Sequence, residues 1–148
     1  MAGVYVEVAG DALDILQLIR HRSDNPTEVL DDIGAFLDQD VTTRFLNELA
    51  PDGTKWEQSE AARTGKGRNP EKPGLTLTDN RDLVGSITHN AEGEELEHGF
   101  SDVDYAAIHQ FGGKAGRNHK ITLPARPMIG IEQKQASTIV EMVTGWLV

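Results

Sequence analysis

A chain of 148 residues fits one domain, and we expect residues 1–148 to form a single unit. Cysteine is absent, which excludes a disulfide framework, a thiolate zinc site and an iron–sulfur cluster. No apolar run approaches the roughly 18 residues that a membrane-spanning helix needs, so a soluble cytoplasmic protein is the starting expectation.

Charge is distributed unevenly along the chain. The net charge of −10 argues against general binding to nucleic acids, because affinity for phosphates comes mostly from Lys and Arg. Residues 1–60 carry 4 basic and 13 acidic side chains, whereas residues 113–148 carry 5 and 2. Copies of the chain can therefore stack head to tail, acidic surface against basic surface. An uneven but merely solvated surface is the alternative.

The first residues predict a short strand and a helix. Apolar and polar residues alternate over residues 4–8, which indicates a strand with one buried face. Asp11 can then cap a helix that runs to about His21. The apolar stripe of that helix consists of Ala12, Ile15, Leu16 and Ile19.

A second, longer helix follows. Asn25 is suited to cap it, Pro26 to occupy its first position, and Glu28 to lie near its positive end. Pro51 forces the end of the helix. Its apolar residues at helical spacing are Leu30, Ile33, Leu37, Val41 and Phe45.

Residues 51–75 are too rich in Gly, Pro and charge to bury a core, and we expect a functional mobile loop at about 58–75. Residues 83–90 and 96–100 predict the strands of a β-hairpin that are central to the sheet, with the polar residues 91–95 at its end. The basic residues of the mobile loop are Arg63, Lys66, Arg68 and Lys72.

A short helical piece is expected over residues 105–110, capped by Asp102 or Asp104 and stopped by Gly112-Gly113. A second mobile loop, residues 112–120, is also basic and contains Lys114, Arg117, His119 and Lys120.

The chain ends in a strand over residues 121–123 and an amphipathic helix. The apolar positions of that helix are Ala136, Ile139, Val140, Val143, Trp146 and Leu147. Together the elements predict an α+β fold: a small antiparallel sheet packs against a long helix and a C-terminal helix, with long extended loops.

Two segments, residues 105–113 and 124–130, concentrate aromatic, Gly, Pro and Arg residues in a few positions. Neither has the spacing of a metal site or of a nucleophilic triad. Such a mixture is more typical of a shaped joint than of a reaction centre.

Several motifs occur in a fixed order. Pro51-Asp52-Gly53 with Trp56 nearby is followed by a Lys-rich loop and a Leu-rich hairpin at 83–87. A Tyr-Ala-x-x-His-Gln-x-Gly block then spans residues 105–113, and a Pro-x-Arg-Pro block spans 124–127. In this order they make the chain resemble the virion-morphogenesis or tail-completion family of Mu-like phages and related prophages. Only the Gly- and Pro-rich residues 64–74 depart from the family pattern.

The resemblance implies a structural protein of the virion, at the neck or tail end, present in the host cytoplasm during assembly. Members of the family look like small α+β domains that act in joining tails to heads, and related assemblies form rings that are often hexameric. The implied partners are copies of the chain itself and other neck and tail proteins, such as a tail terminator and head-completion or connector proteins. DNA in the channel is a further candidate, whereas no membrane, cofactor or metal is expected.

His109 is the candidate for acid–base chemistry. With Tyr105 on the same helical face, it needs Asp104 or Asp102 to orient its ring, but no nucleophile or oxyanion donor is indicated nearby. A His that fixes the turn into the two glycines is favoured. The other histidines show no pair of ligands three to five residues apart, so a zinc site is disfavoured; they are His89, His98 and His119.

Arg126, held between two prolines, points its guanidinium in a fixed direction that suits a carboxylate, either within the subunit or from a neighbour's long helix. Trp56 is expected to pack against the end of the long helix rather than to act as a binding anchor. The basic loops can face DNA, an acidic neighbour or solvent. The candidate interface residues are Trp56, Arg63, Lys66, Arg68, Lys72, Tyr105, His109, Phe111, Lys114, Arg117, Lys120 and Arg126.

The sequence therefore predicts an assembly protein that is not an enzyme and adds to a ring at the head–tail junction. Two rival hypotheses remain. One is a module that contacts DNA in the portal or neck channel through the basic loops. The other is a small hydrolase or nuclease centred on His109.

Overall fold

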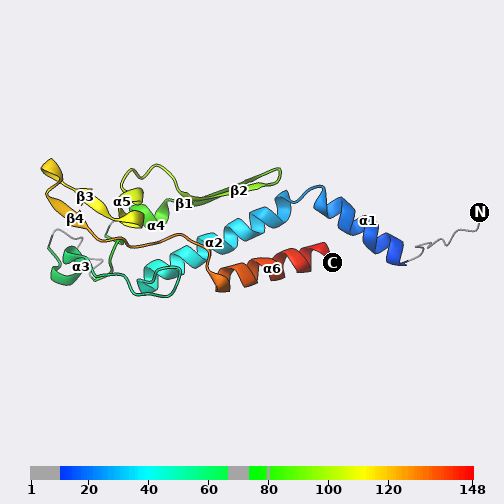
Figure 1. Ribbon diagram of the computed structural model, residues 1–148, viewed down its shortest axis with the longest axis horizontal. Helices are drawn as coiled ribbons and strands as arrows, with labels where there is room; N and C mark the ends of the chain where they lie inside the picture. Colours follow the sequence, from blue (N-terminus) through cyan, green and yellow to red (C-terminus); the bar gives the residue numbers. More distant parts are fainter. Residues whose placement is uncertain (1–10, 67–73, 80) are drawn as a thin grey trace, which may run out of the picture.

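The computed structural model describes residues 11–66, 74–79 and 81–148, which form an elongated α+β fold (Figure 1). Helix α2 (Thr27–Asn47) runs along its middle, with a β-hairpin on one side and helix α6 (Gln133–Leu147) on the other. The predicted α+β class is confirmed, and the long helix is its central element.

Helix α2 begins within a residue of the predicted position, because Pro26 already has helical dihedral angles (φ −80°, ψ −2°). No hydrogen bond from the Asn25 side chain caps it among the described residues. The Thr27 hydroxyl donates instead to the carbonyl of Gly93 at the hairpin tip (3.0 Å). The helix ends at Glu48, whose left-handed backbone (φ 55°) turns the chain just before Pro51.

The buried stripe of α2 starts one residue earlier than predicted, at Val29 rather than Leu30. It also holds Gly34 and Arg44, two residues that apolar periodicity does not flag. The buried residues are Val29, Ile33, Gly34, Leu37, Val41, Arg44 and Phe45.

The hairpin, β1 (Ile87–Glu92) and β2 (Glu95–Phe100), packs against α2, and Gly93 in its tight turn has φ +59°. A Cβ on Gly34 would lie only 2.2 Å from Cδ2 of His89, so the hairpin can approach the helix this closely only over a glycine. This contact fixes the spacing of the two elements.

Residues 83–86 were expected to belong to the first strand, and this prediction is wrong. They lie in and just after the helical turn α4 (Asp82–Gly85), which inserts Leu83 into the core. A short apolar run does not distinguish a strand from a helical turn by periodicity. Within the described residues the hairpin is also a separate two-stranded sheet, so its strands are not central ones there.

Helix α6 packs on α2 as expected. Its start is fixed by a capping box in which the Glu132 and Gln135 side chains bond reciprocally to backbone N–H groups. Val140, expected on the buried stripe, is exposed instead (63%). The contacts with Val29, Ile33 and Leu37 of α2 come from Ile139, Met142, Val143 and Trp146; we call these residues the helical core.

The opposite end of the molecule is irregular. Residues 113–115 and 121–123 pair as a short ribbon where the sequence predicted one strand and a loop over 112–120. Three-residue strands carry too little periodic signal to be recognised. The elements here are α3 (Glu60–Thr64), α5 (Ala106–Phe111), β3 (Gly113–Ala115), the 3₁₀ turn η1 (Arg117–His119) and β4 (Ile121–Leu123).

A second cluster, which we call the joint core, lies between α2 and these irregular segments. Phe45 meets the Trp56 ring edge-on, with centroids 5.3 Å apart, and Met128 is fully buried. Its buried residues are Val41, Phe45, Ala50, Trp56, Leu83 and Met128.

Helix α1 (Asp11–Ser23) extends away from the body along the long axis (Figure 1). It touches α6 near its own C-terminal end, where Arg22 donates a hydrogen bond to the carbonyl of Trp146. In the part of the chain that the structure describes, no helix has the length and apolar character to cross a membrane. The predicted strand at 4–8 lies outside that part.

Candidate functional site

The segment of residues 124–130 is held in place by side chains from distant parts of the chain. Arg44 donates to the carbonyl of Met128 (2.9 Å) and to that of Gly130 (3.1 Å), and Trp56 Nε1 donates to the carbonyl of Pro127 (2.8 Å). Extended chain has no internal partners for its backbone groups, so buried side chains must supply them.

Gln110 joins the two motif segments that the sequence singled out. Its Oε1 accepts from the N–H groups of Met128 (2.8 Å) and Ile129 (3.1 Å), and its Nε2 donates to the carbonyl of Ile129 (2.9 Å). The N–H of Arg126 adds a bond to the carbonyl of His109 (2.7 Å). Residues 105–113 and 124–130 therefore form one joint, whereas the sequence singled out the two segments without predicting their contact.

Gly112 explains why this joint needs glycine. Its backbone is left-handed (φ +71°), and a Cβ there would lie 2.7 Å from the Ala125 nitrogen and 2.9 Å from the Leu123 oxygen. Both obstacles are backbone atoms that cannot move aside. Any side chain at this position would push the two motif segments apart.

The Pro51-Asp52-Gly53 motif forms a closed turn after α2. The Asp52 carboxylate accepts the N–H of Thr54 (2.8 Å), and this hydrogen bond lowers the pKa of Asp52. Gly53 has φ +85°, and Trp56 then bonds back through its N–H to the carbonyl of Glu48 (2.8 Å). The turn thus delivers Trp56 into the joint core.

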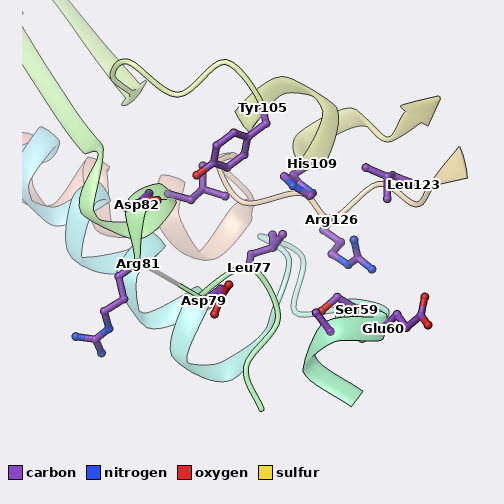
Figure 2. A pocket seen from close by; sticks show the side chains of 12 residues that line it. Ser59, Glu60, Leu77, Asp79, Arg81, Asp82, Tyr105, His109, Leu123 and Arg126 are labelled. Atoms are coloured by element: carbon purple, nitrogen blue, oxygen red, sulfur yellow. The ribbon is translucent and has the colours of Figure 1, made fainter. Parts of the chain in front are cut away.

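A half-open pocket of about 350 Å³ lies beside the joint. Figure 2 shows His109 between Tyr105 and Arg126, with Ser59 and Glu60 at the start of α3 across from them. Because several segments contribute to this pocket, it is the natural place to look for chemistry.

Arg126 is 4% exposed, and burial lowers its pKa. Its Nε donates to the backbone carbonyl of Glu57 (2.6 Å), and no ion pair to a carboxylate is seen within the described residues. The carboxylate partner within the subunit is therefore not seen among these residues, and a carboxylate from a neighbour's long helix stays a prediction. Arg44, by contrast, forms an ion pair with Asp40 one helical turn away.

Burial lowers the pKa of His109, and the positive charge of Arg126 lowers it further. The ring meets Tyr105 edge-on, with centroids 5.9 Å apart, and its buried Nδ1 has no hydrogen-bond partner among the described residues. In that part of the chain, neither Asp102 nor Asp104 orients it. A general base needs such an orienting group, so the geometry favours a packing role.

A second histidine site lies on the hairpin, at two residues that the sequence analysis considered only as disfavoured zinc ligands. His89 and His98 are paired across the hairpin, and both face Asp38 of α2: His89 Nδ1 lies 2.6 Å from Oδ2, and His98 Nε2 lies 3.1 Å from Oδ1. The bond to Asp38 raises the pKa of His89, whereas burial lowers the pKa of His98. Their partner lies some fifty positions away in sequence, which no local motif can reveal.

No group of His, Asp or Glu side chains suited to a metal ion is found in the described ranges. The Nε2 of His98 and the Oδ1 of Asp38 are buried and face each other, but their geometry is not that of a well-directed hydrogen bond.

The candidate interface residues differ in burial. Trp56 and Arg126 are buried in the protomer, where both contribute to packing, and their role at an interface stays a prediction. Tyr105 (45%) and Phe111 (78%) are exposed, whereas His109 is half-buried. Arg68 and Lys72 lie outside the described residues. The remaining candidates are all exposed: Arg63, Lys66, Lys114, Arg117 and Lys120.

The role of Arg44 was not predicted from the sequence, although its guanidinium donates to two carbonyls of the 124–130 segment. The signal was a charged residue on the apolar stripe, directly beside Phe45 and three residues after Val41. A charge at a core position predicts a buried partner.

Comparison with known proteins agrees with the motifs. Residues 9–148 match the phage virion morphogenesis family. The chain belongs to this family. A relative in Haemophilus influenzae (strain Rd), the Mu-like prophage FluMu G protein 2, is 41% identical over 70 residues. That match covers 47% of this chain and 50% of the relative, so the chain spans half the length of the protein it resembles. No solved structure matches.

Membership of the virion morphogenesis family fits a structural or assembly role in a phage particle. The joint gives the family motifs a physical meaning. The Tyr-Ala-x-x-His-Gln-x-Gly block supplies Gln110 and Gly112, which hold the Pro-x-Arg-Pro block beside it. These motifs hold the two segments in a fixed shape.

Proposed function

We propose that this protein acts in tail completion and head–tail joining at the neck of the particle, as a subunit of a ring. The observation that carries the proposal is the match to the virion morphogenesis family over residues 9–148. The relative from a Mu-like prophage adds support, although it is matched over half of its length.

The joint supports a mechanical rather than a catalytic role. Gln110 uses its side-chain amide to hold the backbone of Met128 and Ile129, and Arg44 uses its guanidinium in the same way. His109 makes no hydrogen bond to an orienting carboxylate within the described chain. These polar groups fix a shape that presents the exposed ends to neighbours.

The partners in this proposal are copies of the same chain and other neck and tail proteins, including a tail terminator and head-completion or connector proteins. The short strands β3 and β4 pair only with each other in the described residues, so their outer edges can add to a partner's sheet. In a ring many such contacts act together, so each can be weak.

The test measures molar mass and head–tail joining. The molar mass of the protein is determined by light scattering, alone and mixed with tails purified from a phage mutant that lacks it, and joining of these tails to filled heads is then assayed. Species the size of a ring, or restored joining, support the proposal. A monomer that neither binds tails nor restores joining contradicts it.

A second candidate is a DNA-contacting role in the channel. Its support is the exposed group of Arg63, Lys66, Lys114, Arg117 and Lys120 at one end of the molecule (Figure 1). Such binding would weaken steeply with added salt, because each neutralised phosphate releases a counterion. Duplex DNA titrated at several salt concentrations separates this role from protein binding.

A further inference from the structure

The start of α2 and the hairpin tip lie toward one end of the molecule, whereas α3 and the ribbon β3–β4 lie at the other (Figure 1). The acidic end combines the start of α2 with the hairpin tip, which the bond from Thr27 to Gly93 holds together. Its exposed carboxylates are Glu28, Asp31, Asp32, Glu92, Glu94 and Glu95. The basic end consists of α3 and the ribbon β3–β4, where one exposed carboxylate, Glu60, is outnumbered by exposed Arg63, Lys66, Lys114, Arg117 and Lys120.

Helix α1 projects from the acidic end and leaves large apolar side chains uncovered. Leu13, Ile15, Leu16 and Leu18 are 38%, 50%, 53% and 41% exposed. An apolar helix in water needs a partner surface, because contiguous exposed apolar area is rare on free proteins. Among residues 11–19 the only charges are those of Asp11 and Asp14, so the free part of the helix is acidic as well as apolar.

The basic end offers the complementary surface. Phe111 and Ile121 are 78% and 56% exposed there. They belong to α5 and β4, in the same stretch of chain as Lys114, Arg117 and Lys120. The basic end therefore combines exposed apolar side chains with positive charges, whereas α1 combines them with negative charges.

We propose that α1 and the acidic end of one copy dock on the basic end of the next copy, head to tail. The contact places the apolar side chains of α1 over Phe111 and Ile121 and brings carboxylates opposite Lys114, Arg117 and Lys120. A contact between two different surfaces of the same chain repeats until it closes into a ring or continues as a filament. The inference rests on the ring-subunit part of the proposed function and names the surfaces that build the ring.

Charge favours a second copy of the chain over other partners that could cover α1. An anionic membrane surface or DNA would repel the acidic end, whereas the basic end of another copy attracts it. The basic residues of α1, including Arg22 bonded to Trp146, lie in its last turn at the junction with α6, away from the free part.

The experiment uses two full-length variants, each with one end altered. Lys114→Glu with Lys120→Glu reverses the basic end, and Ile15→Gln with Leu16→Gln makes α1 polar. Each should weaken self-association, measured by light scattering and sedimentation, by at least about 100-fold. Wild-type association should also fall between about 50 mM and about 500 mM salt, because the charged part of the contact is screened.

Mixing the two variants tests the head-to-tail geometry directly. The basic-end variant keeps an intact α1, and the α1 variant keeps an intact basic end, so one good contact remains between them. The mixture should give a heterodimer that cannot grow further. A symmetric contact between identical surfaces predicts no such pairing, and the absence of heterodimer overturns the proposal.

Matched controls exclude general effects of charge and polarity. Lys55→Glu with Lys134→Glu changes the net charge by the same amount at exposed positions outside the basic end. Leu46→Gln with Val140→Gln makes two other exposed apolar helix positions polar. Both controls should associate like wild type, and an equal loss in either one overturns the proposal.

Joining assays separate this inference from the proposed function. If wild-type protein restores joining but stays monomeric, and both end variants restore joining equally well, the head-to-tail contact is wrong while the function stands. If the wild type does not restore joining, the proposed function fails whatever the association state. If α1 variants bind tails more weakly without any change in self-association, the occupant of α1 is a tail protein and the proposal is wrong.

Discussion

The two cores of this protein are built in different ways. In the helical core, Val29, Ile33 and Leu37 meet apolar side chains of α6, and the backbone of both helices satisfies its own hydrogen bonds. In the joint core, apolar side chains surround extended chain whose backbone groups depend on Arg44, Trp56 and Gln110. The helical core should therefore tolerate loss of a polar side chain, whereas the joint should not.

The substitution expected to destabilise the joint core most is Arg44→Met, which keeps an apolar stem and removes the guanidinium. It leaves the carbonyls of Met128 and Gly130 without donors and Asp40 without its ion pair. Removing one partner of a buried charge pair should lower the free energy of unfolding by about 4 kcal/mol, measured by urea denaturation.

Arg63→Met is the control for this change, since Arg63 is exposed on α3. It should change stability by no more than about 0.5 kcal/mol. An Arg44→Met protein as stable as this control would show that apolar packing alone holds the 124–130 segment.

The difference between the helical core and the joint core also explains which parts of the fold could be predicted from the sequence. The long helix and the C-terminal helix were predicted because their apolar residues repeat at a regular spacing, and the hairpin because a polar segment separates its two strands. The joint was recognised as two motif segments, but their connection was not, because Gln110 and Met128 meet across eighteen positions and Arg44 and Met128 across eighty-four. Periodicity records only neighbours within one element.

Gln110→Ala removes the side chain that holds the joint from α5. Three backbone groups, the N–H of Met128 and both polar groups of Ile129, lose their partner. With each unmet group destabilising by 1 to 3 kcal/mol when buried, the free energy of unfolding should fall by about 3 kcal/mol. Amide exchange at Met128 and Ile129 should accelerate more than exchange within α2.

Gln133→Ala, at an exposed position in α6, is the matched change in the helical half. It should shift stability by less than about 0.5 kcal/mol. If the two variants lose equal stability, the joint has no special dependence on its polar side chains.

Gly34→Ala tests the contact between α2 and the hairpin. Alanine favours helix by about 1 kcal/mol, but its Cβ would overlap the His89 ring, which must move with its strand. We expect a net loss of about 2 kcal/mol in thermal or urea unfolding. Gly145→Ala, whose Cβ meets nothing within 4 Å in α6, should instead gain up to about 1 kcal/mol. Equal gains in both variants would show that the hairpin can shift without loss.

The smallest effect, a change in pH dependence, separates the two histidines that face Asp38. The pKa of His89 is raised above its ordinary value of 6.5, so its contribution to stability is complete below that value and is lost as pH rises through the raised pKa. The pKa of His98 is lowered by burial, so this residue destabilises the fold as pH falls below 6.5. The two trends oppose each other in the wild type.

Single variants should expose each trend. His89→Gln removes the gain at low pH, so its stability should fall more steeply than wild type from about pH 7 to pH 5, and His98→Gln should fall less steeply. The surrounding charges are Asp31 and Asp38 on α2 and, for His98, Arg44. Asp38→Asn should bring the pKa of His89 back toward its ordinary value, as read by NMR titration of the ring. Parallel pH curves for all three proteins would mean that the hairpin binds α2 through the shape of Gly34 and His89, with no contribution from charge.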